Sequence, residues 1–235
     1  MGERKLKIAI TGSEGLLGKE ITNYLSKNHK VFKLDLELGH NLSDEKFVKN
    51  WFKKNKVDAL VNCFALNDHV EPGEKRGTLF DVTLQSFSKF LEINLTTLFS
   101  VCREFARNNK KGAIVNFSAT TGIVSARPDI YNGKHKHPAY SISKAGVINL
   151  TKFLATHLAP NIRVNCIAPS LSKSKIAEPM LKNPTIAEGI AKAHPLKRLG
   201  EGKDSAALAK FLITEESSWI TGQIIAVDGG RSKLS

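Results

Sequence analysis

Two residues that can take part in proton transfer stand four positions apart in the second half of the chain. They are Tyr140 and Lys144, in the stretch KHKHPAYSISKAG (residues 134–146). Four residues are about one helical turn, so a helix here places the phenol and the ammonium side by side. The pair is either part of a proton-transfer site or an ordinary neighbour pair on a helix surface. The rest of the sequence must decide between these two interpretations.

A glycine-rich turn near the amino terminus is typical of a dinucleotide site. TGSEGLLG (residues 11–18) follows the apolar run LKIAI (residues 6–10) and opens a helix-length segment. Gly12 permits a tight turn, Gly15 lets the backbone approach a pyrophosphate, and Gly18 permits close packing of helix on strand. The amino end of the helix then faces the anion. From this turn we expect six residues to contact the cofactor: Gly12, Ser13, Gly15, Leu16, Leu17 and Gly18.

The charges around the next apolar run indicate which dinucleotide binds. Asp35 lies at the end of VFKLDL (residues 31–36), where a carboxylate accepts hydrogen bonds from an adenosine ribose. A carboxylate at this place repels a 2′-phosphate, and Glu14 inside the turn adds a second negative charge. NAD(H) is therefore favoured over NADP(H). Lys33 points to the same side of the strand as Asp35 and opposes this preference.

The composition is that of one soluble globular domain. A chain of 235 residues with 41% hydrophobic and 24% charged residues can bury one good core, so we expect a single domain over residues 1–235. We expect a cofactor half over about residues 1–110 and a catalytic and substrate half over about residues 111–235. No apolar run has the length of a signal peptide or membrane span, so no membrane partner is expected. Three scattered cysteines without metal-ligand spacing indicate reduced core residues in a cytoplasmic protein: Cys63, Cys102 and Cys166.

The formal net charge of +13 is the unusual bulk property of this chain. It indicates either attraction to anionic partners or a lysine-rich solvated surface. The lysines are spread along the chain and the nearby aromatic residues have helical core spacing, so no nucleic-acid partner is expected. His135 and His137 have no carboxylate or cysteine partner nearby in the sequence, so no metal site is expected.

Apolar runs alternate with helix-length amphipathic segments along the whole chain. The strand-like runs are residues 6–10, 31–36, 58–66, 112–119, 161–169 and 222–230, and the later helical segments are residues 43–54, 83–108, 139–158 and 203–213. This alternation predicts an α/β fold: one doubly wound Rossmann domain with a parallel sheet of about seven strands and helices on both faces. Residues 67–82 and 170–200 lack clear periodicity and follow strands. We expect them to be substrate-side loops over the carboxyl edge of the sheet.

An ordered set of motifs resembles the single-domain short-chain dehydrogenase/reductase family over essentially the whole chain. After TGSEGLLG come VNCFA (61–65), INL (93–95), IVNFSATTG (114–122), YSISK (140–144), VNCIAPS (164–170) and ITGQIIAVDGG (220–230). The resemblance implies an oxidoreductase in which Tyr140 exchanges a proton with the substrate oxygen while hydride moves to or from nicotinamide. Lys144 then favours the phenolate and hydrogen-bonds the nicotinamide ribose.

The same resemblance implies roles for other positions. Asn94, within a long helix, would open the helix and hold a water of a proton relay; the alternative is a tolerated polar helix residue. Further cofactor contacts are expected at Asn41, Leu42, Asn62, Ala65, Ile167, Pro169 and Leu171, with Asn41 and Leu42 beside the adenine. The VDGGRS tail packs at a subunit interface in this family, so a homo-oligomer is expected, either a tetramer or a dimer.

The chain departs from the family pattern in its glycine spacing and at the catalytic serine. The turn reads T-G-x-x-G-x-x-G, where single-domain members have T-G-x-x-x-G-x-G, and Ala119 stands where the serine is expected. Ala119 cannot hydrogen-bond a substrate oxygen. Thr120 or Thr121 can supply the hydroxyl if the strand has already turned, and Ser118 can do so through a changed register. The remaining alternative is a weakened or absent activity.

A third departure is a longer stretch before Tyr140, IVSARPDIYNGKHKHPA (residues 123–139). A similar insertion is associated with family members from bacterial surface-sugar and flagellin-glycan pathways. A basic, hydrogen-bonding loop suits a phosphorylated or carboxylated sugar, although a solvated loop that touches nothing is the alternative. The candidate substrate residues are Thr121, Arg127, Tyr131 and His137.

These observations together predict an NAD(H)-dependent oxidoreductase. It would interconvert a secondary alcohol and a ketone on a polar small molecule, a sugar or nucleotide-sugar. One alternative is a 3-oxoacyl-thioester reductase of fatty-acid type, against which Asp35 speaks because such reductases usually prefer NADP(H). Another is a catalytically impaired dinucleotide-binding regulator or scaffold, motivated by Ala119. Retention of Tyr140 argues against it, because a pure binding module has no need of the phenol.

Overall fold

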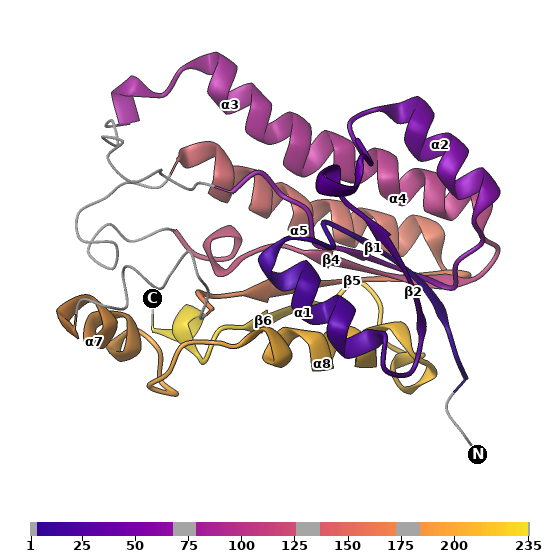
Figure 1. The fold of residues 1–235 in the computed structure, drawn as a ribbon. Helices are drawn as coiled ribbons and strands as arrows, with labels where there is room; N and C mark the ends of the chain where they lie inside the picture. The colour runs from indigo at the N-terminus through magenta and orange to yellow at the C-terminus, as the bar shows by residue number, and fades with distance from the viewer. Residues whose placement is uncertain (1–3, 68–78, 126–136, 173–183, 235) are drawn as a thin grey trace.

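The computed structural model describes residues 4–67, 79–125, 137–172 and 184–234 (Figure 1). Its strands run in parallel in one sheet, in the order β2-β1-β3-β4-β5-β6. Their bounds are β1 Lys7–Thr11, β2 Lys30–Leu34, β3 Ala59–Asn62, β4 Gly112–Phe117, β5 Ile162–Pro169 and β6 Ile224–Val227. The doubly wound α/β class is confirmed. Among the described residues the sheet has six strands, against an expected count of about seven, and the sequence contains six apolar runs of strand length.

The helices follow the amphipathic segments closely. They are α1 Leu16–Leu25, α2 Glu45–Lys54, α3 Leu84–Leu91, α4 Thr97–Asn108, α5 Pro138–Leu158, α7 Pro184–Lys192 and α8 Gly202–Ile213. A π-helical turn, η3 (Glu92–Thr96), joins α3 to α4. Residues 170–200, expected to be a loop, contain α7, whose short amphipathic pattern lies between two prolines.

Two apolar layers hold the helices on opposite faces of the sheet (Figure 1). On one face, Phe52 of α2, Phe105 of α4 and Leu154 of α5 pack on side chains such as Leu60 and Ile114. On the other face, α1 and α8 cover the alternate side chains of the same strands. Because residues alternate sides along a strand, a strand with continuous apolar sequence fits between two helical layers.

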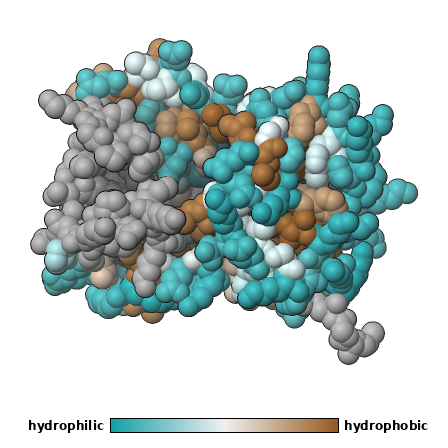
Figure 2. Space-filling view, in the orientation of Figure 1, coloured by the Kyte–Doolittle hydropathy of each residue, from teal (hydrophilic) through white to brown (hydrophobic). Residues whose placement is uncertain are grey.

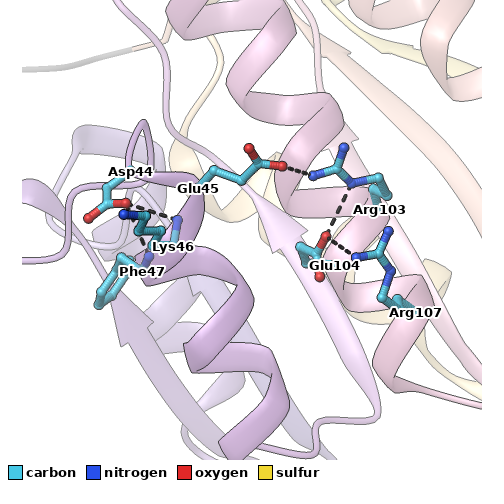
Figure 3. A network of polar contacts seen from close by, with 7 residues as sticks. All are labelled: Asp44, Glu45, Lys46, Phe47, Arg103, Glu104 and Arg107. Carbon is cyan, nitrogen blue, oxygen red and sulfur yellow. Dashed lines mark hydrogen bonds and ion pairs between the residues drawn. The ribbon is translucent and has the colours of Figure 1, made fainter.

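Polar groups at helix ends and between helices fix the outer layer. Asp44 caps α2 by accepting hydrogen bonds from the backbone of Lys46 and Phe47 (Figure 3). The buried carboxylate of Glu104 on α4 is bound by Arg103 and Arg107, each at 3.1 Å, and Arg103 also pairs with Glu45 of α2 (Figure 3). These contacts tie α2 to α4.

The surface seen in the orientation of Figure 1 is largely hydrophilic, with apolar patches between the charged side chains (Figure 2). Such a surface agrees with a lysine-rich composition. Within the described ranges, no helix combines the length and apolar character that a membrane span requires.

Candidate active site

The glycine-rich turn joins β1 to α1 and has no room for side chains at two positions. Gly12 has a φ of +67°, and a Cβ atom there would lie 2.4 Å from the backbone nitrogen of Phe64. A Cβ atom at Gly18 would lie 1.9 Å from the Gly12 carbonyl oxygen. The expected tight turn and close packing are therefore present. Gly15 caps α1 without a side-chain hydrogen bond, and no acidic residue occupies the first turn, so the helix amino end suits an anion.

Ser13 is fully buried in this turn, and Leu16 and Leu17 begin α1. A surface hollow separates the starts of α1 and α8; its lining residues are Leu16, Leu17, Glu20, Ser172, Glu201, Gly202 and Lys203. Pro169 ends β5, and the carbonyl oxygen of Leu171 accepts a hydrogen bond from Gly200 at 3.3 Å. The cofactor candidates from β1, α1 and β5 therefore lie along the carboxyl edge of one sheet.

Asp35 lies directly after β2 and faces the glycine-rich turn. Its Oδ2 atom accepts a hydrogen bond from the Glu14 backbone at 2.9 Å, and its Oδ1 atom accepts one from the Glu37 backbone at 3.0 Å. The Glu14 side chain forms an ion pair with Lys33 at 3.1 Å and a longer one with Lys19 at 3.8 Å. The Asp35 carboxylate thus lies against the turn that carries Glu14, and Lys33 is paired with Glu14. A glycine-rich turn at a helix amino end, with a carboxylate beside it, fits a nicotinamide dinucleotide.

Asn62, expected to contact the cofactor, is the last residue of β3, with 2% of its surface exposed. Its Oδ1 atom accepts from Thr11 at 2.9 Å, and its Nδ2 atom donates to Asn116 at 2.9 Å. Asn116 in turn donates to Thr151 of α5 at 3.0 Å. The Asn62 amide is thus engaged in joining three strands to α5.

The other four cofactor candidates differ in exposure. Ala65, just beyond β3, and Asn41 are exposed, and the Asn41 side chain accepts a hydrogen bond from the Ser43 backbone at 3.1 Å. Leu42 is half-buried and packs against the core beneath α2. Ile167, inside β5, is fully buried in the layer beneath α1 and α8.

Tyr140 and Lys144 occupy the first two turns of α5. The Nζ atom of Lys144 lies 5.9 Å from the centre of the Tyr140 ring and donates a hydrogen bond to the Phe117 carbonyl at 2.9 Å. Lys144 is 4% exposed, and this burial lowers the pKa of its ammonium from 10.5 to about 8. Burial raises the pKa of the nearby Cys63 thiol to about 12 and that of Cys166 to about 11, so both thiols stay neutral.

Asn94 stands in the middle of the π-helical turn η3, so the long helix is locally widened at this residue. Its Oδ1 atom accepts from the Leu66 backbone at 2.7 Å, and its Nδ2 atom donates to the Leu66 carbonyl at 3.0 Å. Nδ2 also donates to Ser143 at 3.0 Å, and Ser143 donates to the Tyr140 carbonyl at 2.7 Å. Sequence reasoning missed Ser143, whose signal was its position three residues after Tyr140 on the same helix.

The hydroxyl groups around Ala119 are placed differently from one another. Ser118 donates to the Lys144 carbonyl at 2.7 Å, so its hydroxyl packs against α5. Ala119 is extended, and Thr120 and Thr121 begin a 3-10 turn after it. Among the described residues, the side-chain oxygens of Thr120 and Thr121 are buried without a hydrogen-bond partner. Buried hydroxyls without a partner are uncommon and are often found at functional sites.

His137, expected to contact substrate, caps the amino end of α5. Its Nδ1 atom accepts from the Ala139 backbone at 3.3 Å, and its Nε2 atom lies 3.0 Å from the Ser86 hydroxyl. The ring stacks on Phe90 of α3 with centres 4.4 Å apart. These contacts give His137 a structural place in the fold. Two other substrate candidates, Arg127 and Tyr131, lie outside the described residues.

A buried polar cluster at the ends of β5 and β6 was not foreseen. The Ser170 hydroxyl lies 2.9 Å from His194 Nε2 and accepts from Arg231 at 3.2 Å. The carboxylate of Asp228 accepts from the backbone of Gly230 and Ser232. The residues come from segments up to 61 positions apart, so the sequence held no local signal for the cluster. Over the described part of the chain, no group of His, Cys, Asp or Glu side chains is arranged to hold a metal ion.

The fold and the site are those of a nicotinamide-dependent oxidoreductase of the doubly wound α/β class. A family model described as enoyl-(acyl carrier protein) reductase matches residues 5–232. The chain belongs to the short-chain dehydrogenase/reductase family.

Three similar proteins illustrate this membership. Dehydrogenase/reductase SDR family member 4 of Mus musculus is 30% identical over 194 aligned residues, with 79% of this chain and 63% of that protein covered. Nodulation protein G of Rhizobium sp. (strain N33) is 29% identical over 255 residues, with 97% of each chain covered. A short-chain dehydrogenase from Leptospira borgpetersenii, solved with bound NAD+, is 27% identical with a TM-score of 0.85, covering 98% of this chain and 94% of that one.

Proposed function

We propose that this protein is an NAD(H)-dependent dehydrogenase that interconverts a secondary alcohol and a ketone, with Tyr140 as the general acid/base. The observation that carries the proposal is the pairing of Tyr140 with the buried Lys144 at the sheet edge that also holds the glycine-rich turn. When bound, NAD(H) supplies the hydride acceptor or donor.

Other residues of the site favour loss of the phenol proton, position Tyr140 and bind the cofactor. Lys144 places a positive charge 5.9 Å from the phenol ring, which favours loss of the phenol proton to solvent or substrate. Asn94 and Ser143 hold the first turn of α5 through the Tyr140 carbonyl, so the phenol keeps a fixed position. The Gly12–Gly18 turn and the amino end of α1 would bind the pyrophosphate, and Asp35 the adenosine ribose.

A threonine hydroxyl replaces the serine hydroxyl that is missing at Ala119. Ser118 is engaged with the Lys144 carbonyl, whereas the hydroxyls of Thr120 and Thr121 have no partner among the described residues. Either threonine can donate to a substrate oxygen and so orient it toward Tyr140. This hydroxyl is the basis for expecting a working enzyme instead of an impaired binding protein.

NAD(H) is the proposed cofactor, and a sugar or nucleotide-sugar the proposed substrate class. The first choice is supported by Asp35 beside Glu14, and by the NAD+ in the Leptospira borgpetersenii relative. The second is supported by the basic residues of the sequence between Gly122 and Tyr140, which suit a carboxylated or phosphorylated sugar. We also propose a homo-oligomer, either a dimer or a tetramer, which light scattering of the purified protein measures directly.

The decisive experiment is a titration of the purified protein with NADH and NADPH, followed by oxidation assays with NAD on sugars, nucleotide-sugars and simple secondary alcohols. We expect tighter binding of NADH and turnover that Tyr140→Phe abolishes while NADH binding persists. A Tyr140→Phe variant with undiminished turnover would disprove the assigned role.

A reductase of 3-oxoacyl thioesters is the second candidate. The description of the matching family model and the net charge of +13, which attracts acidic carrier proteins, favour it. It requires turnover of an acyl-thioester substrate, with NADPH preferred. The same cofactor titration and an acetoacetyl thioester in the substrate panel separate the two candidates.

A further inference from the structure

Four charged side chains meet where the glycine-rich turn faces the end of β2. Glu14 is at their centre, with Lys33 Nζ 3.1 Å from its Oε1 atom and Lys19 Nζ 3.8 Å from its Oε2 atom. Its backbone N–H donates to Asp35 at 2.9 Å, so the Asp35 carboxylate lies against the backbone of the same residue. Two negative and two positive groups therefore balance one another at this place.

Lys33 is the group here that is best placed to attract a phosphate. It lies two residues before Asp35, and Asp35 is also extended, so the two side chains leave the same side of the chain. Its side chain is 49% exposed, whereas that of Glu14 is 15% exposed. The less exposed carboxylate therefore holds the more exposed lysine in an ion pair.

We propose that Glu14 sets the preference for NAD(H) by holding Lys33 in an ion pair, so that this lysine is not available to a 2′-phosphate beside Asp35. A phosphate monoester carries nearly two negative charges near neutral pH. With Glu14 ionised, such a group meets two carboxylates and a neutralised Lys33. Without the Glu14 charge, it meets one carboxylate and an available Lys33. This inference rests on the proposed function, since it concerns the same cofactor site.

The test measures dissociation constants for NADH and NADPH by fluorescence titration, with no need of a substrate. Glu14→Gln removes the charge while it keeps the side-chain size and the backbone bond to Asp35. Lys33→Met removes the released lysine, alone and in combination with Glu14→Gln. Glu216→Gln removes one negative charge from an exposed position in the turn before β6 and serves as the matched control.

We expect Glu14→Gln to raise affinity for NADPH relative to NADH about tenfold, an effect that high salt reduces. The double variant should lose most of this gain, and Glu216→Gln should leave the ratio near that of the unmodified protein. An unchanged ratio in Glu14→Gln, or a gain that survives Lys33→Met, overturns the inference while NADH binding still supports the proposed function. A protein that binds neither dinucleotide overturns both.

Discussion

The ammonium group of Lys144 lies 5.9 Å from the centre of the Tyr140 ring and is almost completely removed from solvent. Its hydrogen bond goes to the Phe117 carbonyl, at the end of the central strand β4. The helix α5 therefore presents one polar pair to the carboxyl edge of the sheet, and the strand fixes the lysine from below. Burial of this charge has a measurable consequence for stability.

Stability of the cofactor-free protein should rise with pH between about 8 and 10.5, compared with Lys144→Met. Burial lowers the pKa of Lys144 from 10.5 to about 8, so in this window the unfolded chain binds a proton that the folded protein has lost. Between pH 7.5 and pH 9.5, the free energy of unfolding measured in urea should rise by roughly 2 kcal/mol more for the wild type than for the variant. The buried thiols act in the opposite direction above pH 9 but are common to both proteins. An identical pH dependence in the two proteins would contradict the effect.

Replacement of Thr120 or Thr121 by valine should separate catalysis from stability. Neither hydroxyl has a partner among the described residues, so valine removes no internal hydrogen bond and should leave the free energy of unfolding unchanged or higher. Replacement of the threonine that orients the substrate should lower kcat by about 10²- to 10³-fold. Ser118→Ala is the control, because it removes the bond to the Lys144 carbonyl and should cost about 1 kcal/mol of stability. An undiminished kcat in both valine variants would show that neither hydroxyl orients the substrate.

His137→Ala should destabilise the start of α5, and His137→Asn should restore much of the loss. The imidazole Nδ1 atom accepts from the Ala139 backbone, and an Asn side chain can accept at the same cap position. We expect the Ala variant to lose about 1 kcal/mol more than the Asn variant in urea unfolding. The kcat of the Ala variant should also fall, because Tyr140 lies in the first turn of the helix that His137 caps. Equal stability of the two variants would show that the cap contributes nothing.

Arg103→Met should destabilise the protein more than Arg107→Met. Arg103 binds both the buried Glu104 and Glu45 of the neighbouring helix, whereas Arg107 binds Glu104 alone and its side chain is 56% exposed (Figure 3). Loss of Arg103 leaves a buried carboxylate with one partner, at a cost of about 1–3 kcal/mol, against less than about 1 kcal/mol for Arg107. Chemical denaturation measures both, and dinucleotide affinity should stay unchanged. A larger loss of stability in Arg107→Met than in Arg103→Met would contradict this prediction.

The fold class was predictable because its signals are local and periodic. Six apolar runs separated by amphipathic segments specify a parallel sheet between two helical layers, and the structure has these elements within a few residues of the expected ranges. The expected count of about seven strands is one higher than the six of the described residues, because the sequence contains six apolar runs of strand length. The short helix α7 was missed because prolines obscure its pattern.

The sequence by itself determined the parts of the site whose members are close along the chain. Tyr140 and Lys144 are one helical turn apart, and the glycines of residues 11–18 belong to one turn, so local geometry fixes both groups. The tertiary structure alone decided which polar groups meet across the fold. Asn94 bonds Leu66 and Ser143, His137 bonds Ser86, and Asn62 is used within the sheet, through pairs 28 to 54 residues apart. A buried polar side chain must find a partner wherever packing brings one near, and packing is a property of the whole chain.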